Sequence, residues 1–208
     1  GTNDGTLTYA YLAAKELGAD YTIMANGGMG VLWGSGDDNV SMKKYPYLND
    51  TGRYEKVDDV KVPYVYEGYT RGADIAVIGL STNDNYRYTL RYNEELKAYK
   101  KANSTATEAD VNAHMSAWAD DMMTQLKAEL ATLIEEIIKN HGEKVSIVLA
   151  RGMMEKGENA SDAEFYHTPV TYMTKVIEEE WENKYTVDGV DHAVLVTRLT
   201  PDRTGYDN

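Results

Sequence analysis

Short apolar runs and longer helical stripes alternate along the chain. One compact run covers 75–80 and ends abruptly in Ser-Thr-Asn-Asp at 81–84. Comparable runs lie at 21–25, 144–150 and 191–197. Short apolar runs bounded by polar residues are typical of buried strands, and strands covered on both faces are typical of parallel sheets. We therefore predict four strands that belong to a parallel sheet.

The clearest helical pattern runs from Val111 to Ile137, where apolar residues recur every three or four positions. Thr107 and Asp110 predict a capping box before this helix, and Asn-His-Gly at 140–142 predicts its end. The methionine and tryptophan residues of the stripe indicate core packing and not a cofactor site.

Two further segments, 7–17 and 162–184, also predict helices. Strands that alternate with helices indicate one α/β domain over 1–208, with right-handed crossovers and helices on both faces of the sheet. Residues 31–72 are rich in Gly, Asp, Asn and Tyr, so we predict a long loop there. Residues 85–106 lack a clean apolar face, and we predict an insert or a lid over a site.

Composition narrows the possible partners. A net charge of −13 argues against nucleic acid and anionic membrane, because both require a basic surface. The absence of cysteine excludes disulfides and zinc-thiolate sites. The acidic cluster at 37–39 supplies too few oxygen ligands for calcium, so we predict no metal and no cofactor.

Tyrosine is unusually frequent, with 17 residues against a single phenylalanine. A tyrosine ring offers a flat apolar face and a terminal hydroxyl, which suits clefts that bind sugars. The same bias also occurs on ordinary tyrosine-rich surfaces. Both interpretations stay open at this point.

The polar end of the run at 75–80 is a candidate site. In open α/β sheets, ligands bind in the crevice beyond the carboxyl ends of the strands. Asn83 would hold an amide donor over that crevice. The alternative is that residues 81–84 form only a turn and a helix cap.

Two motifs follow the first two predicted strands, Asn-Gly-Gly-Met-Gly at 26–30 and Ser-Thr-Asn-Asp at 81–84. In order and placement they resemble the second and third blocks of the SGNH (GDSL-type) hydrolases, most closely the acetyl esterases of carbohydrate esterase family 2. The resemblance implies a three-layer α/β/α, flavodoxin-like fold. It implies that Gly28 donates its backbone N–H, and Asn83 its side-chain amide, to an oxyanion. Ser81 replaces the glycine that is usual in the family.

The same resemblance implies further site residues. Asp207, in the closing Gly-Tyr-Asp-Asn, would orient a catalytic histidine. The residues expected to contact substrate are Asn26, Gly30, Trp33, Asp84 and His167. For Gly28 a tight turn is the alternative role, and the surrounding glycines also allow a phosphate-binding loop. A complete dinucleotide-binding glycine pattern is not present, because position 33 is tryptophan.

No Gly-Asp-Ser and no His-Pro occurs in the sequence. The resemblance therefore implies that the first strand, the nucleophile and the base lie outside this chain, which we expect to be an incomplete and inactive domain. The expected function is a serine esterase that hydrolyses acetyl or other short acyl esters on oligo- or polysaccharides. The family implies a secreted or cell-surface bacterial protein, although the sequence suits the cytoplasm equally well. The alternative function is a non-catalytic, flavodoxin-like glycan-binding module.

Overall fold

The computed structural model describes both helices and strands, including a parallel sheet, which is consistent with the predicted α/β class in general. Of the helix predicted at 162–184, only 180–181 lie within the described residues. The described residues are 8–23, 28, 30–33, 54–57, 60–63, 72–80, 82–151, 180–181, 185–187 and 189–198. The helices are α1 (Tyr9–Leu17), α2 (Thr82–Ala102) and α3 (Glu108–His141). The strands are β1 (Tyr54–Val57), β2 (Val60–Pro63), β3 (Ile75–Ile78), β4 (Ser146–Arg151), β5 (Tyr185–Val187), β6 (Val190–His192) and β7 (Val194–Arg198).

Three strands form a parallel sheet in the order β3-β4-β7. These strands confirm the predictions at 75–80, 144–150 and 191–197, except that Ala193 divides the last run into β6 and β7. β6 pairs with β5 in a separate antiparallel sheet. The parallel sheet is the scaffold that presents the candidate site.

The strand predicted at 21–25 is wrong for its first three residues, which lie outside any strand, and Met24 and Ala25 lie outside the described residues. The Tyr21 ring instead packs edge-on against Tyr11 of α1, with the ring centroids 5.1 Å apart. Tyr21 and Ile23 are both exposed. An apolar run this short cannot specify a strand by itself, because a strand also requires a hydrogen-bonding partner.

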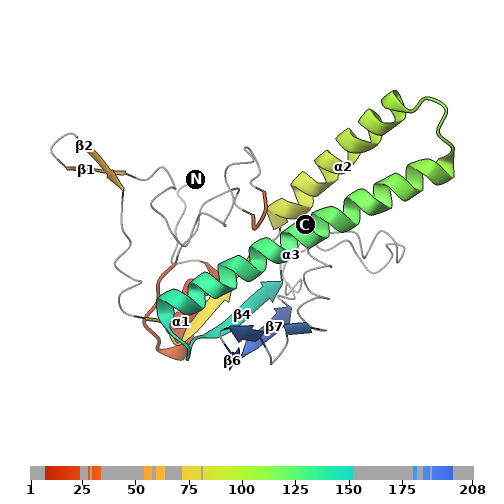
Figure 1. Ribbon diagram of the computed structural model, residues 1–208. Coiled ribbons are helices and arrows are strands. Elements are labelled where there is room, and N and C mark those ends of the chain that lie inside the picture. The colour runs from red at the N-terminus through yellow and green to blue at the C-terminus, as the bar shows by residue number, and fades with distance from the viewer. Residues whose placement is uncertain are drawn as a thin grey trace, which may run out of the picture.

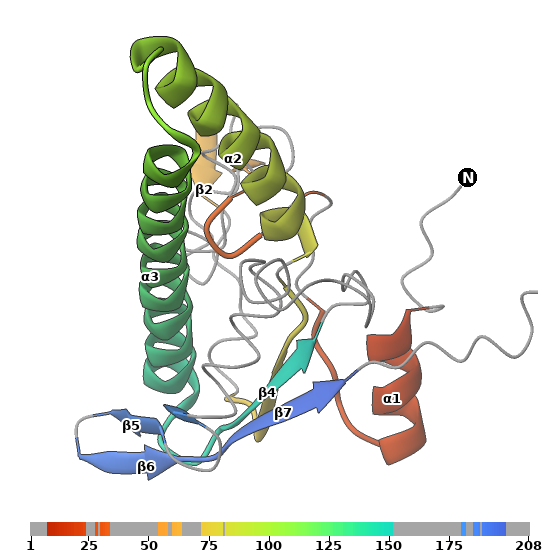
Figure 2. The same cartoon turned by 90° about the vertical axis from the view of Figure 1, so that its right-hand side faces the viewer.

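α3 covers one face of the sheet and supplies more of the described core than any other element (Figures 1 and 2). The capping box is present as predicted: Thr107 Oγ1 accepts from the Asp110 N–H, and the Asp110 carboxylate accepts from the Thr107 N–H. Gly142 caps the other end of the helix. The buried face of α3 consists of Val111, Met115, Ala119, Met123, Leu126, Leu130, Leu133, Ile134 and Ile138. Burying each large aliphatic side chain contributes about 1.5–3 kcal/mol, which makes this stripe the main stabilising element.

The segment predicted as an insert or lid is a continuous helix, α2, which packs against α3 and projects with it away from the sheet (Figure 1). Its buried face is built partly from tyrosines, Tyr88, Tyr92 and Tyr99 among them. Tyrosine carries a hydroxyl and therefore registers as half-polar, which hid the helical stripe in the sequence. A helical form is compatible with an insert and with a lid, so both stay predictions for 85–106.

The long loop predicted at 31–72 also needs correction. β1 and β2 pair antiparallel inside it, with Val57 opposite Val60 and Lys56 opposite Lys61. The sequence hid this hairpin because Lys, Glu and Asp interrupt its valines. Residues 31–33 are buried, which a surface loop would not show.

α1 is present close to its predicted bounds, capped by Thr8 and ended by Gly18 in the left-handed conformation at φ 62°. It lies on the opposite side of the parallel strands from α3 (Figure 2). α1 nevertheless buries none of its own residues. On β3, Ile75 and Val77 are 57% and 58% exposed. Within the described structure, the sheet is thus well packed on the face that α3 covers, whereas Ile75 and Val77 of β3 are left largely uncovered.

Candidate functional site

The candidate site lies where β3 passes into α2. The strand ends at Ile78, and α2 begins only four residues later at Thr82. Asn83 and Asp84 are therefore held in the first turn of a helix, beyond the carboxyl end of a parallel strand. This is the part of an α/β sheet where ligands usually bind.

The carboxylate of Asp84 is fully buried and joins this helix turn to a distant segment of the chain. Its Oδ2 accepts the N–H of Val31 at 2.8 Å. Its Oδ1 accepts the N–H groups of Leu32 at 2.8 Å and Trp33 at 3.0 Å. Hydrogen bonds to an ionised acceptor are about twice as strong as neutral ones. One side chain thus fixes three successive backbone groups against the start of α2.

The pKa of the Asp84 carboxyl reflects two opposing causes. Burial raises the pKa above its ordinary value of 3.8, because a charged carboxylate loses its hydration. The hydrogen bonds from Val31, Trp33 and Leu32 act in the opposite direction and do not fully compensate. The charge is therefore held in place at a cost, which is common where a buried carboxylate organises a site.

Two glycines permit this close approach. A Cβ atom added to Gly30 would lie 2.6 Å from Asp84 Oδ2 and 2.8 Å from its Cγ, and would also collide with the Trp33 carbonyl oxygen. Gly28 has a φ of 85°, a conformation that other residues rarely adopt. Local geometry thus accounts for a glycine at positions 28 and 30, with or without a role in catalysis.

The side chain of Trp33 is clamped by the same helix. Its ring lies 6.5 Å from that of Tyr88, and the guanidinium of Arg91 lies 5.7 Å from the ring centroid of Trp33. Trp118 of α3 completes the cluster, 5.4 Å from Tyr88. Trp33 is only 6% exposed, so its ring is part of the core in this structure.

Three of the residues expected to contact substrate, Gly30, Trp33 and Asp84, lie together, and all three are buried. Their described contacts hold residues 31–33 against α2. Contact of these residues with a substrate stays a prediction. Asn83 is half-buried and next to Asp84 in the chain, and Gly28 precedes the bound segment. Asn26, His167 and Asp207 lie outside the described residues.

The alternative of a phosphate-binding loop concerns residues 27–30, of which Gly27 and Met29 lie outside the described residues. Successive backbone N–H groups form anion-binding concavities in such loops. The neighbouring N–H groups of Val31, Leu32 and Trp33 are donated to Asp84 and cannot contribute to such a concavity. A role of 27–30 in anion binding stays an alternative.

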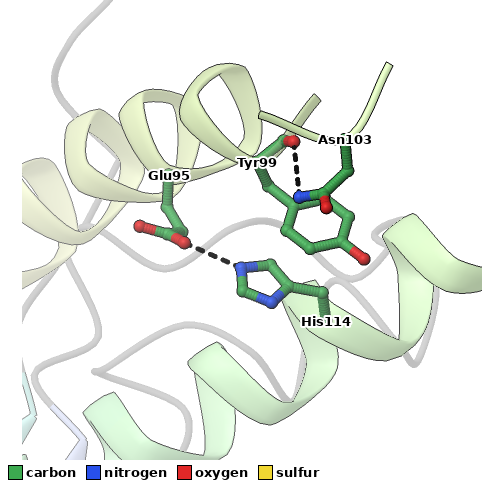
Figure 3. A network of polar contacts seen from close by, with 4 residues as sticks. All are labelled: Glu95, Tyr99, Asn103 and His114. Carbon is green, nitrogen blue, oxygen red and sulfur yellow. Dashed lines mark hydrogen bonds and ion pairs between the residues drawn. The ribbon is translucent and has the colours of Figure 1, made fainter. Parts of the chain in front are cut away.

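The structure contains a second polar cluster that we did not predict, between the distal parts of α2 and α3 (Figure 3). His114 Nε2 lies 2.7 Å from Glu95 Oε1. The Tyr99 ring stacks on the His114 ring, with centroids 3.9 Å apart and planes inclined by 13°. Asn103 Nδ2 donates to the Tyr99 carbonyl oxygen at 3.0 Å. The spacing of Glu95, Tyr99 and Asn103 by four residues was the available signal, because such residues share one helix face.

The Glu95 and His114 side chains are 34% and 33% exposed, so their ion pair contributes little to stability. The cluster connects α2 to α3 through the Glu95–His114 contact and the stacked rings of Tyr99 and His114, and we call it the distal clasp. No group of three or more His, Asp or Glu residues suited to a metal occurs within the described part of the chain. Among the helices of that part, none is long and apolar enough to cross a membrane.

Comparisons with known proteins identify no relative of this chain. No protein-family model, no curated protein and no solved structure matches the chain. Any functional assignment therefore depends on the residues and their geometry.

Proposed function

We propose that this chain is the greater part of an SGNH-type serine esterase domain that removes acetyl or other short acyl groups from carbohydrates. One observation carries the proposal. The Asp84 carboxylate binds the segment that follows Gly28, and thereby brings it to the helix turn that carries Asn83. This attachment supports our proposal that the glycine motif and the asparagine motif, 55 positions apart in sequence at residues 28 and 83, belong to one site.

The proposed chemistry assigns a role to each donor. A serine attacks the ester carbonyl with a histidine as general base, and the tetrahedral intermediate carries an oxyanion. The Gly28 N–H would donate to this oxyanion, since a glycine allows a close approach. The Asn83 amide would donate to it without bringing a charge. The proposal places the serine and the histidine outside these 208 residues, because the family's blocks for both are absent from the sequence.

Two features favour the finer parts of this proposal. The exposed side chains of Ile75 and Val77 favour a larger, flavodoxin-like sheet, because parallel sheets are usually covered on both faces. Tyr86 lies three residues after Asn83 on α2 and is 57% exposed. Residues three apart share a helix face, so its ring is available to stack on a sugar next to the scissile ester.

The test uses the longer protein that this proposal requires, which would include the serine and the histidine. It is assayed with p-nitrophenyl acetate and with acetylated xylan. We expect ester hydrolysis, and Asn83→Ala should lower kcat by about 100-fold with little change in KM, because removing one oxyanion donor costs about 3 kcal/mol. Asn112→Ala, an exposed asparagine on α3, is the matched control and should keep its kcat. A folded long protein without hydrolysis, or an unchanged kcat for Asn83→Ala, would contradict the proposal.

A non-catalytic glycan-binding module is the second candidate, favoured by the 17 tyrosines and by the exposed ring of Tyr86. It requires binding without turnover. Retarded migration of the long protein in a gel containing xylan, with no acetate released, would favour this function over the esterase.

A further inference from the structure

Residues 31–33 form neither a helix nor a strand, yet each of their backbone N–H groups donates a hydrogen bond. Buried N–H groups outside secondary structure require another acceptor. All three N–H groups of this segment find it in one carboxylate, that of Asp84. The three backbone N–H groups of the segment therefore depend on a single carboxylate.

The attachment to α2 has two points. Asp84 holds the backbone, while Tyr88 and Arg91, one and two turns further along α2, contact the Trp33 ring. Two separated contacts fix the orientation of the segment as well as its position. Residues 31–33 are therefore attached to α2 through both their backbone and the Trp33 ring.

Asp84 is also the direct chain neighbour of Asn83. Any displacement of the helix turn that moves Asn83 consequently also moves the carboxylate to which residues 31–33 are attached. Such a common frame would keep two donors in register, which matters because oxyanion donors act only when positioned before the reaction.

We propose that Asp84 is a positioning residue that fixes residues 31–33, and through them the Gly28 N–H that precedes them in the chain, relative to the Asn83 amide. The inference rests on the proposed esterase function for its catalytic consequence, while the attachment itself is a property of the fold. Asp84 touches no substrate in this role.

The geometry distinguishes the two carboxylate oxygens. Oδ1 serves Leu32 and Trp33, whereas Oδ2 serves Val31 alone. In Asp84→Asn, the amide retains one oxygen, and the orientation that keeps two hydrogen bonds turns its NH2 group toward Val31. Two donors would then face each other, so the Val31 N–H should lose its acceptor while the other two keep theirs.

Amide hydrogen exchange on the 208-residue chain tests the attachment without any need for activity. In Asp84→Asn we expect the exchange rate of Val31 to rise by about 100-fold or more, and that of Leu32 and Trp33 to rise less. Asp121→Asn is the matched control, since Asp121 is exposed and bonds only to Gln125 among the contacts described. An unchanged Val31 rate would overturn the inference.

If Asp84→Asn does not fold, the unaltered chain decides the question. Protection of the three amides comparable to that of the α3 core would support the attachment, because no ladder or helix explains it. Rapid exchange of all three, as in an exposed loop, would overturn it.

Kinetics of the longer protein test the catalytic consequence. We expect Asp84→Asn to lower kcat by about 10-fold or more at unchanged KM, measured at a temperature where circular dichroism shows the variant folded. An unchanged kcat with rapid Val31 exchange would overturn the positioning role alone. Absence of hydrolysis in the unaltered long protein would remove the esterase proposal and the positioning role together, whereas hydrogen exchange would still establish or refute the attachment.

Discussion

Asp84 and Asp110 are a natural pair for comparison. Each lies in the first turn of a helix, and each carboxylate accepts backbone N–H groups. Asp110 Oδ2 accepts from the Thr107 N–H at 2.9 Å and from the Thr107 hydroxyl at 2.7 Å, fully exposed to solvent. Asp84 accepts three N–H groups inside the protein.

Their pKa values move in opposite directions. Hydrogen bonds from the Thr107 side chain and backbone lower the pKa of Asp110 below 3.8. Burial raises the pKa of Asp84 despite its hydrogen bonds. The comparison shows that loss of hydration, not the number of hydrogen bonds, decides the sign, and that the same local chemistry can either cap a helix or fix a distant segment.

The largest expected effect is on global stability. Asp84→Ala leaves three buried N–H groups without an acceptor, and we expect the free energy of unfolding to fall by about 3 kcal/mol or more. Asp110→Ala removes an exposed cap and should cost much less. Urea denaturation followed by circular dichroism measures both variants, and equal losses would break the comparison.

The pH dependence should also separate the two residues. The raised pKa of Asp84 means that the folded state holds its proton longer, so this residue's contribution to stability falls as pH rises from 3.8 through the folded pKa. The lowered pKa of Asp110 gives a contribution that is present above 3.8 and is lost as pH falls through the folded pKa.

Unfolding free energies measured from pH 3 to pH 7 for the unaltered chain, Asp84→Asn and Asp110→Asn test this prediction. Relative to the unaltered chain, Asp84→Asn should remove the contribution to the unfolding free energy that falls with rising pH. Asp110→Asn should remove the contribution that increases with rising pH. Slopes of the same sign would contradict the assigned causes.

The smallest expected effect concerns the clasp at the far end of α2. Glu95→Gln removes the charge beside His114 but leaves the stacking of Tyr99 on that imidazole. Because both side chains are partly exposed, we expect a loss below about 1 kcal/mol in the same denaturation assay. A loss approaching that of Asp84→Ala would mean that the distal clasp, too, is essential to the fold.

The same pair shows what the sequence could reveal. The partner of Asp110 lies three residues away, so the capping box was predictable from spacing alone. The partners of Asp84 lie 51–53 residues away in a segment without periodicity, and no local pattern indicates them. For the same reason α3 and the strands of the parallel sheet were predictable, whereas the burial of Trp33 and the β1–β2 hairpin were not.

Nuclear magnetic resonance titration of the unaltered chain tests the central claim most directly. We predict that the Asp84 carboxyl carbon titrates above the ordinary aspartate value, and that the amide protons of Val31, Leu32 and Trp33 shift with the same midpoint. The Asp110 carboxyl should titrate below that value in the same sample. Amide protons of 31–33 that ignore the Asp84 titration would contradict the claim that this carboxylate holds residues 31–33 at the helix turn that carries Asn83.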